Sequence, residues 1–293
     1  MITKTLLQAI KPFRLVSLIT TYILGAGLVQ YVRTLRDYGL MIQGGIFILC
    51  LVLSVEFIRV IQQLLDPNNW PKDSLLNEIK RLRWTIALIT ATLLTVIVII
   101  LIDWMVRGIL WQGLTLLLFG FFISLVVYYI ADIRRSLLPY RILIEVLIFV
   151  VFPPAISFFL HSPEPHRVLS LVFLGFIPVY LAYRILVQIK SYQHDHQYEI
   201  ITFVTYAGWE RAMVLHNALI LVTFLIFAII AAIGFPWFLL WPVFLVFPIG
   251  LLEIWLMERV RRGAKPMWGL MQLAAGCVFF IPIYLVGFAF WIR

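Results

Sequence analysis

Long apolar runs separated by short polar segments fill the chain from residue 15 to residue 291. Each run is continuously apolar rather than alternating, and about 20 such residues cross the roughly 30 Å hydrocarbon core of a bilayer as a helix. The pattern therefore predicts an all-α integral membrane protein with nine transmembrane helices. The predicted spans are residues 15–32, 40–64, 84–106, 109–131, 142–160, 168–187, 213–233, 236–257 and 267–291.

Short connections and prolines interrupt this pattern. Only Arg107 and Gly108 separate the third and fourth spans, and only Gly234 and Phe235 separate the seventh and eighth, so we expect tight turns outside the membrane there. Prolines such as Pro153 fall inside several spans, where they leave backbone carbonyls without an N–H partner. Neighbouring helices are expected to satisfy those carbonyls.

Composition and charge exclude a soluble or disordered chain. Of the 293 residues, 63% are hydrophobic and 13% are charged, whereas a soluble domain has about 25% charged residues. The net charge of +9 suits nucleic-acid binding, but the basic residues lie in loops between spans, where they report membrane orientation instead. We therefore predict no nucleic-acid partner.

The basic residues also predict an orientation. With the N-terminus inside, the inner segments hold 17 of the 23 lysines and arginines and the outer segments hold five. This asymmetry predicts a cytoplasmic N-terminus. The whole chain, residues 1–293, is predicted to form one transmembrane domain, with two long cytoplasmic loops, residues 65–83 and 188–212, covering an opening on that side.

Polar side chains line one face of the second and sixth spans. In the second span this face carries Glu56, Arg59, Gln63 and Asp66. In the sixth it carries Tyr180, Arg184, Gln188, Ser191 and Asp195. Because ionisable groups inside a bilayer are costly and normally face the bundle interior or water, both faces predict the lining of a polar cavity. The alternative is a polar clamp between helices, with Arg59 paired to Glu56 on its own helix.

Other charged residues lie near these faces in the sequence. Lys72 and Arg141 are candidates to hold a diphosphate or an anionic lipid headgroup, although positive-inside topology explains them equally well. Glu145 and Glu253 lie within or near spans. They are candidates to line the same cavity, with water-exposed positions as the alternative.

Nine helices, a cytoplasmic N-terminus and polar motifs at the inner ends of the second and sixth helices together resemble the UbiA superfamily of intramembrane prenyltransferases. The local resemblance is best at residues 59–66 and 191–211, where T-F-V-T-Y-A-G-W-E-R-A from Thr202 is similar to the family's T-L-x-V-x-L-G-x-E-x-A. The family carries N-D-x-x-D-x-x-x-D or D-x-x-x-D motifs whose aspartates hold Mg²⁺ against the diphosphate of a polyprenyl donor. The resemblance implies a UbiA-like bundle that binds an isoprenoid.

The same motifs depart from the family pattern at most acidic positions. Asp66 and Asp195 stand where family aspartates would, and the resemblance assigns them as metal ligands. The neighbouring acidic positions are taken by Gln62 or Gln63, Trp70, Gln188 and Ser191. Since Mg²⁺ usually takes one or two carboxylates plus substrate phosphates, a single ion between the two aspartates is conceivable, whereas a two-ion clamp is poorly supported.

Two functions follow from these departures. Removing one group that stabilises developing charge typically costs about 10²–10³ in rate, which favours a non-catalytic subunit of a membrane complex. It would bind an isoprenoid, a prenylated lipid or a pigment in its helical cavity among membrane lipids. The alternative is an active Mg²⁺-dependent prenyltransferase that moves a polyprenyl group from its diphosphate to an aromatic or chlorin-type acceptor.

A transporter is disfavoured because the chain shows no duplicated half with discontinuous helices. The candidate ligand-binding residues are Arg59, Gln63, Lys72, Arg141, Arg184, Gln188 and Ser191.

Overall fold

The structure, a computed structural model, describes residues 12–33, 35, 37–65, 76–133 and 135–292. Within these residues, nine helical segments are long and apolar enough to cross a membrane, which confirms the predicted spans. They are Pro12–Arg33, Tyr38–Gln62, Ile79–Val106, Gln112–Ala131, Leu137–Phe159, Arg167–Gln197, Trp209–Ala232, Trp237–Arg261 and Trp268–Ile292.

Seven spans are formed by single helices and two by several pieces. The single helices are α2 (Pro12–Arg33), α3 (Tyr38–Leu65), α4 (Leu76–Val106), α5 (Gln112–Ile133), α8 (Arg167–Gln197), α10 (Trp209–Ala232) and α13 (Trp268–Ile292). The fifth span comprises the 3₁₀ helix η2 (Arg135–Tyr140), α6 (Arg141–Val146), the π-helix η3 (Leu147–Val151) and α7 (Phe152–Phe159). The eighth comprises α11 (Trp237–Phe244) and α12 (Phe247–Arg261), and a short α9 (Phe203–Ala207) connects α8 to α10.

Proline chemistry explains the broken fifth span. Pro153 has no N–H, so it cannot donate to the carbonyl of Phe149 four residues earlier. Thr21 Oγ1 of α2 donates to that carbonyl oxygen instead, at 2.9 Å. A neighbouring helix thus satisfies the freed carbonyl, as the sequence predicted. The same contact fixes α2 against the segment that carries Glu145.

The predicted tight turns are confirmed, and helices extend into both of the predicted long loops. Gly108 and Gly234 adopt φ values of 68° and 92° at their turns. The predicted loop 188–212 is helical as far as Gln197, because its polar residues include good helix formers that extend α8 by almost three turns. The predicted loop 65–83 is shorter, since α4 begins at Leu76; residues 66–75 lie outside the described part of the chain.

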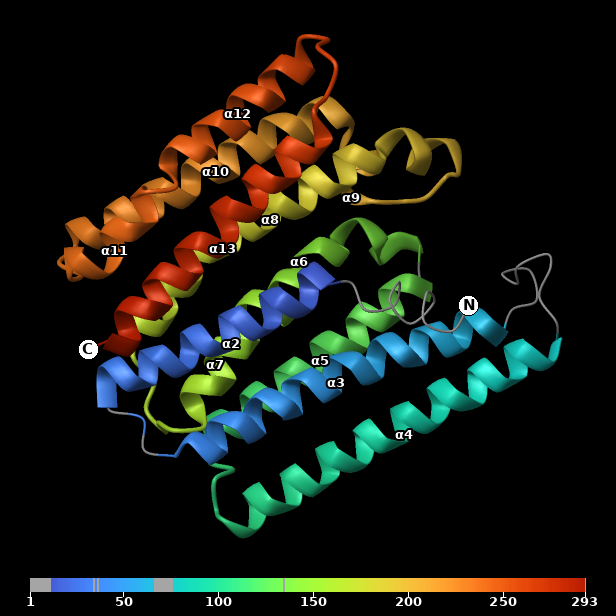
Figure 1. Ribbon diagram of the computed structural model, residues 1–293, viewed down its shortest axis with the longest axis vertical. Helices are drawn as coiled ribbons and strands as arrows, with labels where there is room; N and C mark the ends of the chain where they lie inside the picture. Colours follow the sequence, from blue (N-terminus) through green and yellow to red (C-terminus); the bar gives the residue numbers. More distant parts are fainter. Residues whose placement is uncertain (1–11, 34, 36, 66–75, 134, 293) are drawn as a thin grey trace.

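The helices lie antiparallel in one elongated bundle (Figure 1). Helix α2 runs between α13 and α3 and packs on α7, where Gly25 meets Pro154 so closely that a Cβ would lie 2.4 Å from its carbonyl oxygen. Helix α8 packs on α10 and α13, and α4 packs on α3 at the edge of the bundle. We call the end where α2 begins the Arg14 end; the turns at Gly108 and Gly234 lie at the opposite end.

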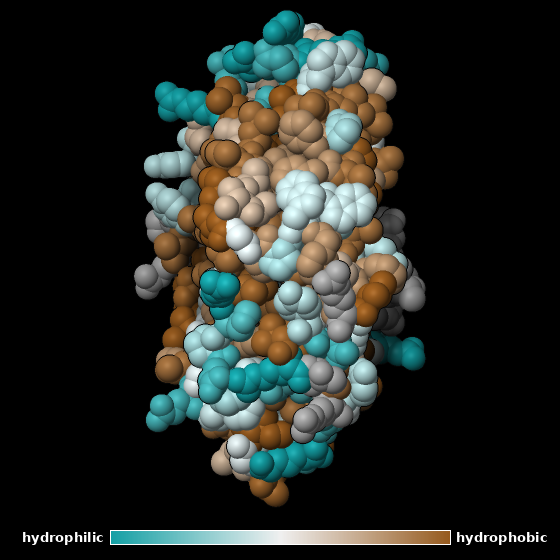
Figure 2. Space-filling model, turned by 90° about the vertical axis from the view of Figure 1, so that its left-hand side faces the viewer, coloured by the Kyte–Doolittle hydropathy of each residue, from teal (hydrophilic) through white to brown (hydrophobic). Residues whose placement is uncertain are grey.

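The outer surface of the bundle is apolar. Large side chains such as Val106, Trp84 and Leu116 are well exposed, and Figure 2 shows hydrophobic residues over much of the visible face, between hydrophilic groups. Soluble proteins rarely expose such extended apolar area. The surface is therefore suited to contact with lipid, and the protein is a multi-pass integral membrane protein.

Candidate functional site

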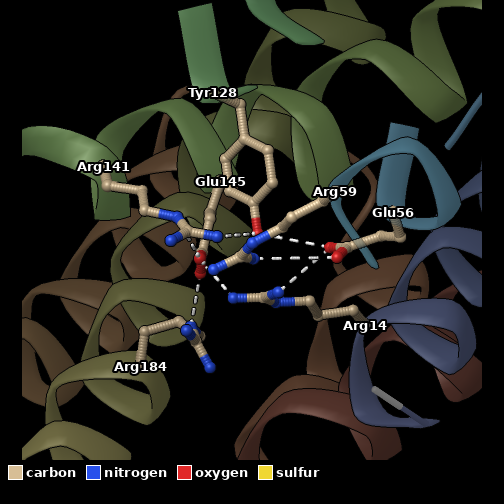
Figure 3. A network of polar contacts seen from close by, with 7 residues as sticks. All are labelled: Arg14, Glu56, Arg59, Tyr128, Arg141, Glu145 and Arg184. Carbon is tan, nitrogen blue, oxygen red and sulfur yellow. Dashed lines mark hydrogen bonds and ion pairs between the residues drawn. The ribbon is translucent and has the colours of Figure 1, made fainter. Parts of the chain in front are cut away.

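Seven polar side chains meet inside the bundle toward its Arg14 end (Figure 3). They come from α2, α3, α5, α6 and α8. We call them the arginine–glutamate cluster: Arg14, Glu56, Arg59, Tyr128, Arg141, Glu145 and Arg184.

Glu145 is the centre of this cluster, and its side chain is only 2% exposed. Its two oxygens lie 2.5 Å from Arg14 Nη2 and 2.5 Å from Arg184 Nε. The Nε of Arg141, one turn earlier on the same helix, lies 3.7 Å from Oε1. Three guanidinium groups from three helices therefore converge on one carboxylate.

Glu56 forms a second, smaller centre on α3. Its Oε1 lies 3.3 Å from Arg14 Nη1, and its Oε2 lies 3.7 Å from Arg59 Nη1. The hydroxyl of Tyr128 donates to Oε1 at 3.4 Å. Arg14 thus bridges the two carboxylates. The pairing of Arg59 with Glu56 on its own helix is the contact that the clamp alternative predicted.

Tyr128 of α5 connects the two centres. Its hydroxyl accepts a hydrogen bond of 2.6 Å from Arg141 Nη2, and the Arg141 guanidinium lies 4.2 Å from the centre of its ring. That separation is suited to a cation–π contact. The phenol therefore orients Arg141 and lowers the cost of burying its charge.

The fold places Arg14 in the cluster through one face of α2. Arg14, Ser17 and Thr21 follow each other at offsets of 0, 3 and 7, and all three are buried. In the sequence, Arg14 is one of the basic residues before the first span, where its charge indicates membrane orientation and not a site. The polar spacing within an otherwise apolar helix was the available signal. Tyr128 offered no comparable signal, because aromatic residues are common throughout these spans.

Charge in the cluster is unbalanced. Among its seven residues, four are arginines and two are glutamates, a formal surplus of two positive charges. A guanidinium has five N–H donors and no acceptor, and Arg14 Nε is buried without a hydrogen-bond partner. Because buried charge is destabilising unless it is paired, this arrangement is suited to an additional anion.

Three of the predicted ligand-binding residues are brought together here. Arg59, Arg141 and Arg184 all belong to the cluster. Gln63 follows one turn after Arg59 on α3, but its side chain lies outside the described part of the structure. Asp66 and Lys72 also lie outside the described residues.

The remaining predicted residues lie farther along α8 and have local partners. Gln188 Oε1 accepts a hydrogen bond of 3.3 Å from the Val204 N–H and so holds α9. Ser191 donates to Asp195 Oδ2 at 2.7 Å, and Asp195 Oδ1 lies 3.5 Å from His194 Nδ1. The predicted face of α8 is therefore divided: Arg184 joins the cluster, and the next three turns organise the helix end. The convergence of Asp66 and Asp195 stays a prediction.

The carboxylates within the described residues do not by themselves form a Mg²⁺ site. They include no group of three or more His, Cys, Asp or Glu side chains arranged to hold a metal ion. Glu56 and Glu145 are already engaged by guanidinium groups, whereas Mg²⁺ demands near-octahedral oxygen ligands. Binding of Mg²⁺ by these two glutamates is therefore not supported.

A second buried ionisable site lies between α8, α10 and α12. Glu253 is 1% exposed, and its Oε1 lies 3.1 Å from Nε2 of His216. Nδ1 of His216 lies 2.9 Å from the carbonyl oxygen of Ala182, which can only accept, so Nδ1 donates. One interpretation of the sequence had expected Glu253 to line the same cavity as Glu145. Instead, Glu253 is paired with His216 and does not join Glu145.

Comparison with known proteins supports the fold. No family model and no curated protein matches this sequence. Among solved structures, a UbiA homolog from Archaeoglobus fulgidus bound to GPP and Mg²⁺ is similar over 99% of this chain and 100% of that chain, with a TM-score of 0.57 and 15% identity. The chain therefore has the UbiA-type prenyltransferase fold that its motifs resembled.

Proposed function

We propose that this protein binds the anionic head of an isoprenoid or prenylated lipid at the arginine–glutamate cluster, without a metal ion, as a non-catalytic subunit of a membrane complex. The observation that carries the proposal is the convergence of three guanidinium groups on Glu145. The UbiA-type fold adds support, because the solved structure that it resembles is bound to GPP.

The chemistry of the cluster suits a phosphate or diphosphate group. Guanidinium groups bind phosphate oxygens through two parallel N–H···O bonds, and such charge-assisted bonds are roughly twice as strong as neutral ones. Two negative charges on the ligand would balance the formal surplus of the cluster. Arginine stays charged at any physiological pH, so this binding needs neither Mg²⁺ nor a change of protonation.

Three residues farther along α8 support a non-catalytic role. Cleavage of an allylic diphosphate requires stabilisation of the departing negative charge, and each missing stabilising group costs about 10²–10³ in rate. Gln188 and Ser191 are neutral where the family pattern has acids, and Asp195 is paired with Ser191. The retained fold with a changed site is what a binding subunit requires.

Ligand binding in nanodiscs tests the proposal. We expect labelled geranylgeranyl diphosphate to bind equally well in Mg²⁺ and in EDTA, and to bind roughly 10–100-fold more weakly to Arg184→Gln. Arg107→Gln is the matched control, because Arg107 lies at the opposite end and pairs with Asp103 at 3.0 Å. Binding that requires Mg²⁺, or an affinity that is unchanged in Arg184→Gln, would overturn the metal-free site.

The second candidate is an active Mg²⁺-dependent prenyltransferase. It is favoured by the GPP and Mg²⁺ in the similar solved structure and by Asp195, a candidate ligand together with Asp66. Incubation with labelled geranylgeranyl diphosphate, Mg²⁺ and aromatic or chlorin-type acceptors distinguishes the two functions. Transfer that disappears in Asp195→Asn would establish the enzyme, and absence of transfer with retained binding supports the subunit.

The proposed orientation places the N-terminus and the arginine–glutamate cluster toward the cytoplasm. It is supported by the excess of lysines and arginines in the segments on that side. A cysteine introduced at Gln197, the last residue of α8, should react with an impermeant reagent only from the cytoplasmic side.

A further inference from the structure

An open cleft lies at the end of the bundle opposite the Arg14 end. It is formed by the last residues of α2, the first residues of α8 and the turn between α10 and α11, and its volume is about 850 Å³. These three segments lie at the same end of the molecule (Figure 1). The residues that line the cleft are not those of the arginine–glutamate cluster, so the cleft is a separate cavity.

The cleft lies where membrane spans end. Arg33 is the last residue of the first span, Arg167 is the first residue of the sixth, and Ala232 is the last residue of the seventh. The exposed indole of Trp237 begins the eighth span beside the same turn. Because the ends of spans and their tryptophans lie at the level of the lipid headgroups, a molecule in this cleft would lie between water and hydrocarbon.

Four polar side chains line the cleft, and the protein leaves hydrogen-bonding groups of all four unused. Within the described residues, the guanidinium of Arg167 and the hydroxyls of Tyr31 and Ser170 have no polar partner. Nδ1 of His166 accepts a hydrogen bond of 3.3 Å from the Val168 N–H. Neutral imidazole then carries its proton on Nε2, which is free to donate.

Ser170 differs from other serines in the membrane-spanning helices. The hydroxyls of Ser17, Ser54 and Ser124 donate to the carbonyl four residues earlier, at 2.8, 2.7 and 2.8 Å. This bond to its own helix is a common way to satisfy a hydroxyl in an apolar environment. Ser170 does not form it, so its hydroxyl is available to a molecule in the cleft.

The charge of the cleft is positive and unbalanced. Arg167 contributes a full positive charge, and no carboxylate belongs to the described residues that line the cleft. Glu164, three residues before Arg167, is paired with Arg33 at 2.5 Å. The cleft is therefore suited to an anion and offers no partner to the ammonium group of a zwitterionic lipid.

The rest of the lining is apolar. Val32, Leu171 and Phe235 contribute to it, and Ile233 is 65% exposed. A water occupies about 30 Å³ of liquid, so a phosphate of five heavy atoms fills on the order of 150 Å³. A free phosphate would leave most of the 850 Å³ to water against an apolar wall. A phosphate with glycerol and the start of hydrocarbon chains matches both parts of the lining.

We propose that this cleft binds the headgroup of an anionic phospholipid from the leaflet on that side of the membrane. The guanidinium of Arg167 and the Nε2–H of His166 donate to phosphate oxygens, because charge-assisted bonds of this kind are the strongest available there. The hydroxyls of Tyr31 and Ser170 bond to the remaining headgroup oxygens, and the hydrocarbon chains begin beside Leu171. This proposal does not depend on the proposed function, since the two sites lie at opposite ends.

Photolabelling in nanodiscs of phosphatidylcholine locates the headgroup. Phosphatidylglycerol with a diazirine at the start of one acyl chain should label peptides that contain residues 31–32, 166–171 and 233–236. The same diazirine on phosphatidylcholine should label the lipid-facing surface evenly. Unlabelled phosphatidylglycerol should displace the specific labelling, and an equal concentration of inorganic phosphate should not.

Arg167→Gln is the decisive variant. It should lower the affinity for phosphatidylglycerol about tenfold, the lower end expected for bonds to a charged group, because the residue is exposed. The unfolding midpoint should not change, since Arg167 has no partner within the described residues to lose. Arg107→Gln is the matched control: it removes the same charge at the same end, but Arg107 pairs with Asp103 and does not line the cleft.

Tyr31→Phe and Ser170→Ala test the hydroxyls without a change of charge. Each should lower the affinity about threefold, as expected for one neutral hydrogen bond. Unchanged affinity in both variants would overturn the role of the hydroxyls in holding the headgroup.

The remaining outcomes decide the site itself. Equal labelling of the cleft by phosphatidylglycerol and phosphatidylcholine would overturn selection by charge, and displacement by inorganic phosphate would overturn the lipid assignment. Labelling by phosphatidylglycerol that spreads over the whole lipid-facing surface, or that is unchanged in well-folded Arg167→Gln, would overturn the cleft as a binding site. These measurements use no isoprenoid diphosphate, so the proposed function is tested separately.

Discussion

The arginine–glutamate cluster and the His216–Glu253 pair both place ionisable side chains inside the bundle, but they differ in charge balance. With Nδ1 of His216 donating to a carbonyl, a single imidazole faces a single carboxylate at 3.1 Å in the pair. In the cluster, Arg14, Arg141 and Arg184 share Glu145. The one-to-one pair is explained by helix packing, whereas the excess of arginines over glutamates among the seven cluster residues is suited to an additional anion.

The difference makes opposite predictions for the two sites. In the balanced pair, loss of either partner should affect stability and leave ligand binding unchanged. In the cluster, loss of the shared carboxylate should be very destabilising, while loss of one arginine should affect mainly ligand binding. Substitutions in the two sites therefore test whether charge balance separates ligand binding from helix packing.

The largest effect is expected for Glu145→Gln. It leaves three guanidinium groups facing one another without their carboxylate, and removal of one partner from a buried ion pair costs about 3–5 kcal/mol. Thermal unfolding in detergent should show this loss, and geranylgeranyl diphosphate should restore part of it. Glu164→Gln is the control, because its pair with Arg33 is exposed and such pairs contribute about 0–1 kcal/mol. A Glu145→Gln protein as stable as the wild type would contradict the role of Glu145 as the centre.

Arg184→Gln should separate binding from stability. Glu145 keeps Arg14 and Arg141 as partners in this variant, so the unfolding midpoint should change little. A hydrogen bond to a charged group contributes about 1.5–3 kcal/mol, so the affinity for geranylgeranyl diphosphate should fall roughly 10–100-fold. Equilibrium binding and thermal unfolding on the same preparation check both parts. A large loss of stability without a loss of affinity would make Arg184 a structural residue.

Glu253→Met should show the reverse pattern. It leaves His216 Nε2 buried without a partner, at a cost of about 1–3 kcal/mol. Combining it with His216→Leu removes both polar partners, so the double variant should lose less stability than the sum of the two single variants. Affinity for geranylgeranyl diphosphate should be unchanged in all three. Additive losses, or weakened binding, would contradict a balanced packing pair.

The fold was predictable because the bilayer imposes one dominant rule on the sequence. Runs of apolar residues defined eight of the nine spans to within five residues at each end and the start of the sixth to within one, and Gly108 and Gly234 marked the tight turns. The polar face through Asp195 indicated that α8 continues beyond its apolar span, but its end at Gln197 was not predicted, because hydropathy follows the bilayer and does not report where a helix ends in water. Helix bounds there depend on backbone propensity and capping, as at the capping box between Thr202 and Thr205.

The site was only partly predictable, because a cluster between helices depends on their relative rotation. Arg59, Arg141 and Arg184 could be chosen from charge and helical spacing on single helices. That Glu145 would bind Arg14 from a segment 131 residues away, and that Glu253 would pair with His216, could not be read from spacing on one helix. The first contact follows from the packing of α2 on the broken fifth span, and the second from the packing of α12 on α10.

The smallest effect is expected at His161, a histidine in the connection between α7 and α8 that contrasts with His216. Its Nε2 is buried without a hydrogen-bond partner. Burial lowers the pKa of His161 below its ordinary 6.5, although nearby Asp37 acts in the opposite direction. The unfolded chain then binds a proton at higher pH than the folded protein does. The contribution of His161 to stability should therefore be constant at pH values above the pKa that this histidine has in the unfolded chain. It should fall as the pH drops through that pKa.

Unfolding midpoints measured at about pH 7.5 and pH 5.5, which bracket the ordinary histidine pKa, test this expectation. The midpoint of the wild type should be lower at acidic pH, and His161→Gln should remove part of that difference because glutamine does not titrate. His216→Gln is the contrasting variant, since its stability loss should already be present at neutral pH, where Glu253 loses its partner. An acid-induced fall that is identical in the wild type and in His161→Gln would show that burial of His161 does not govern it.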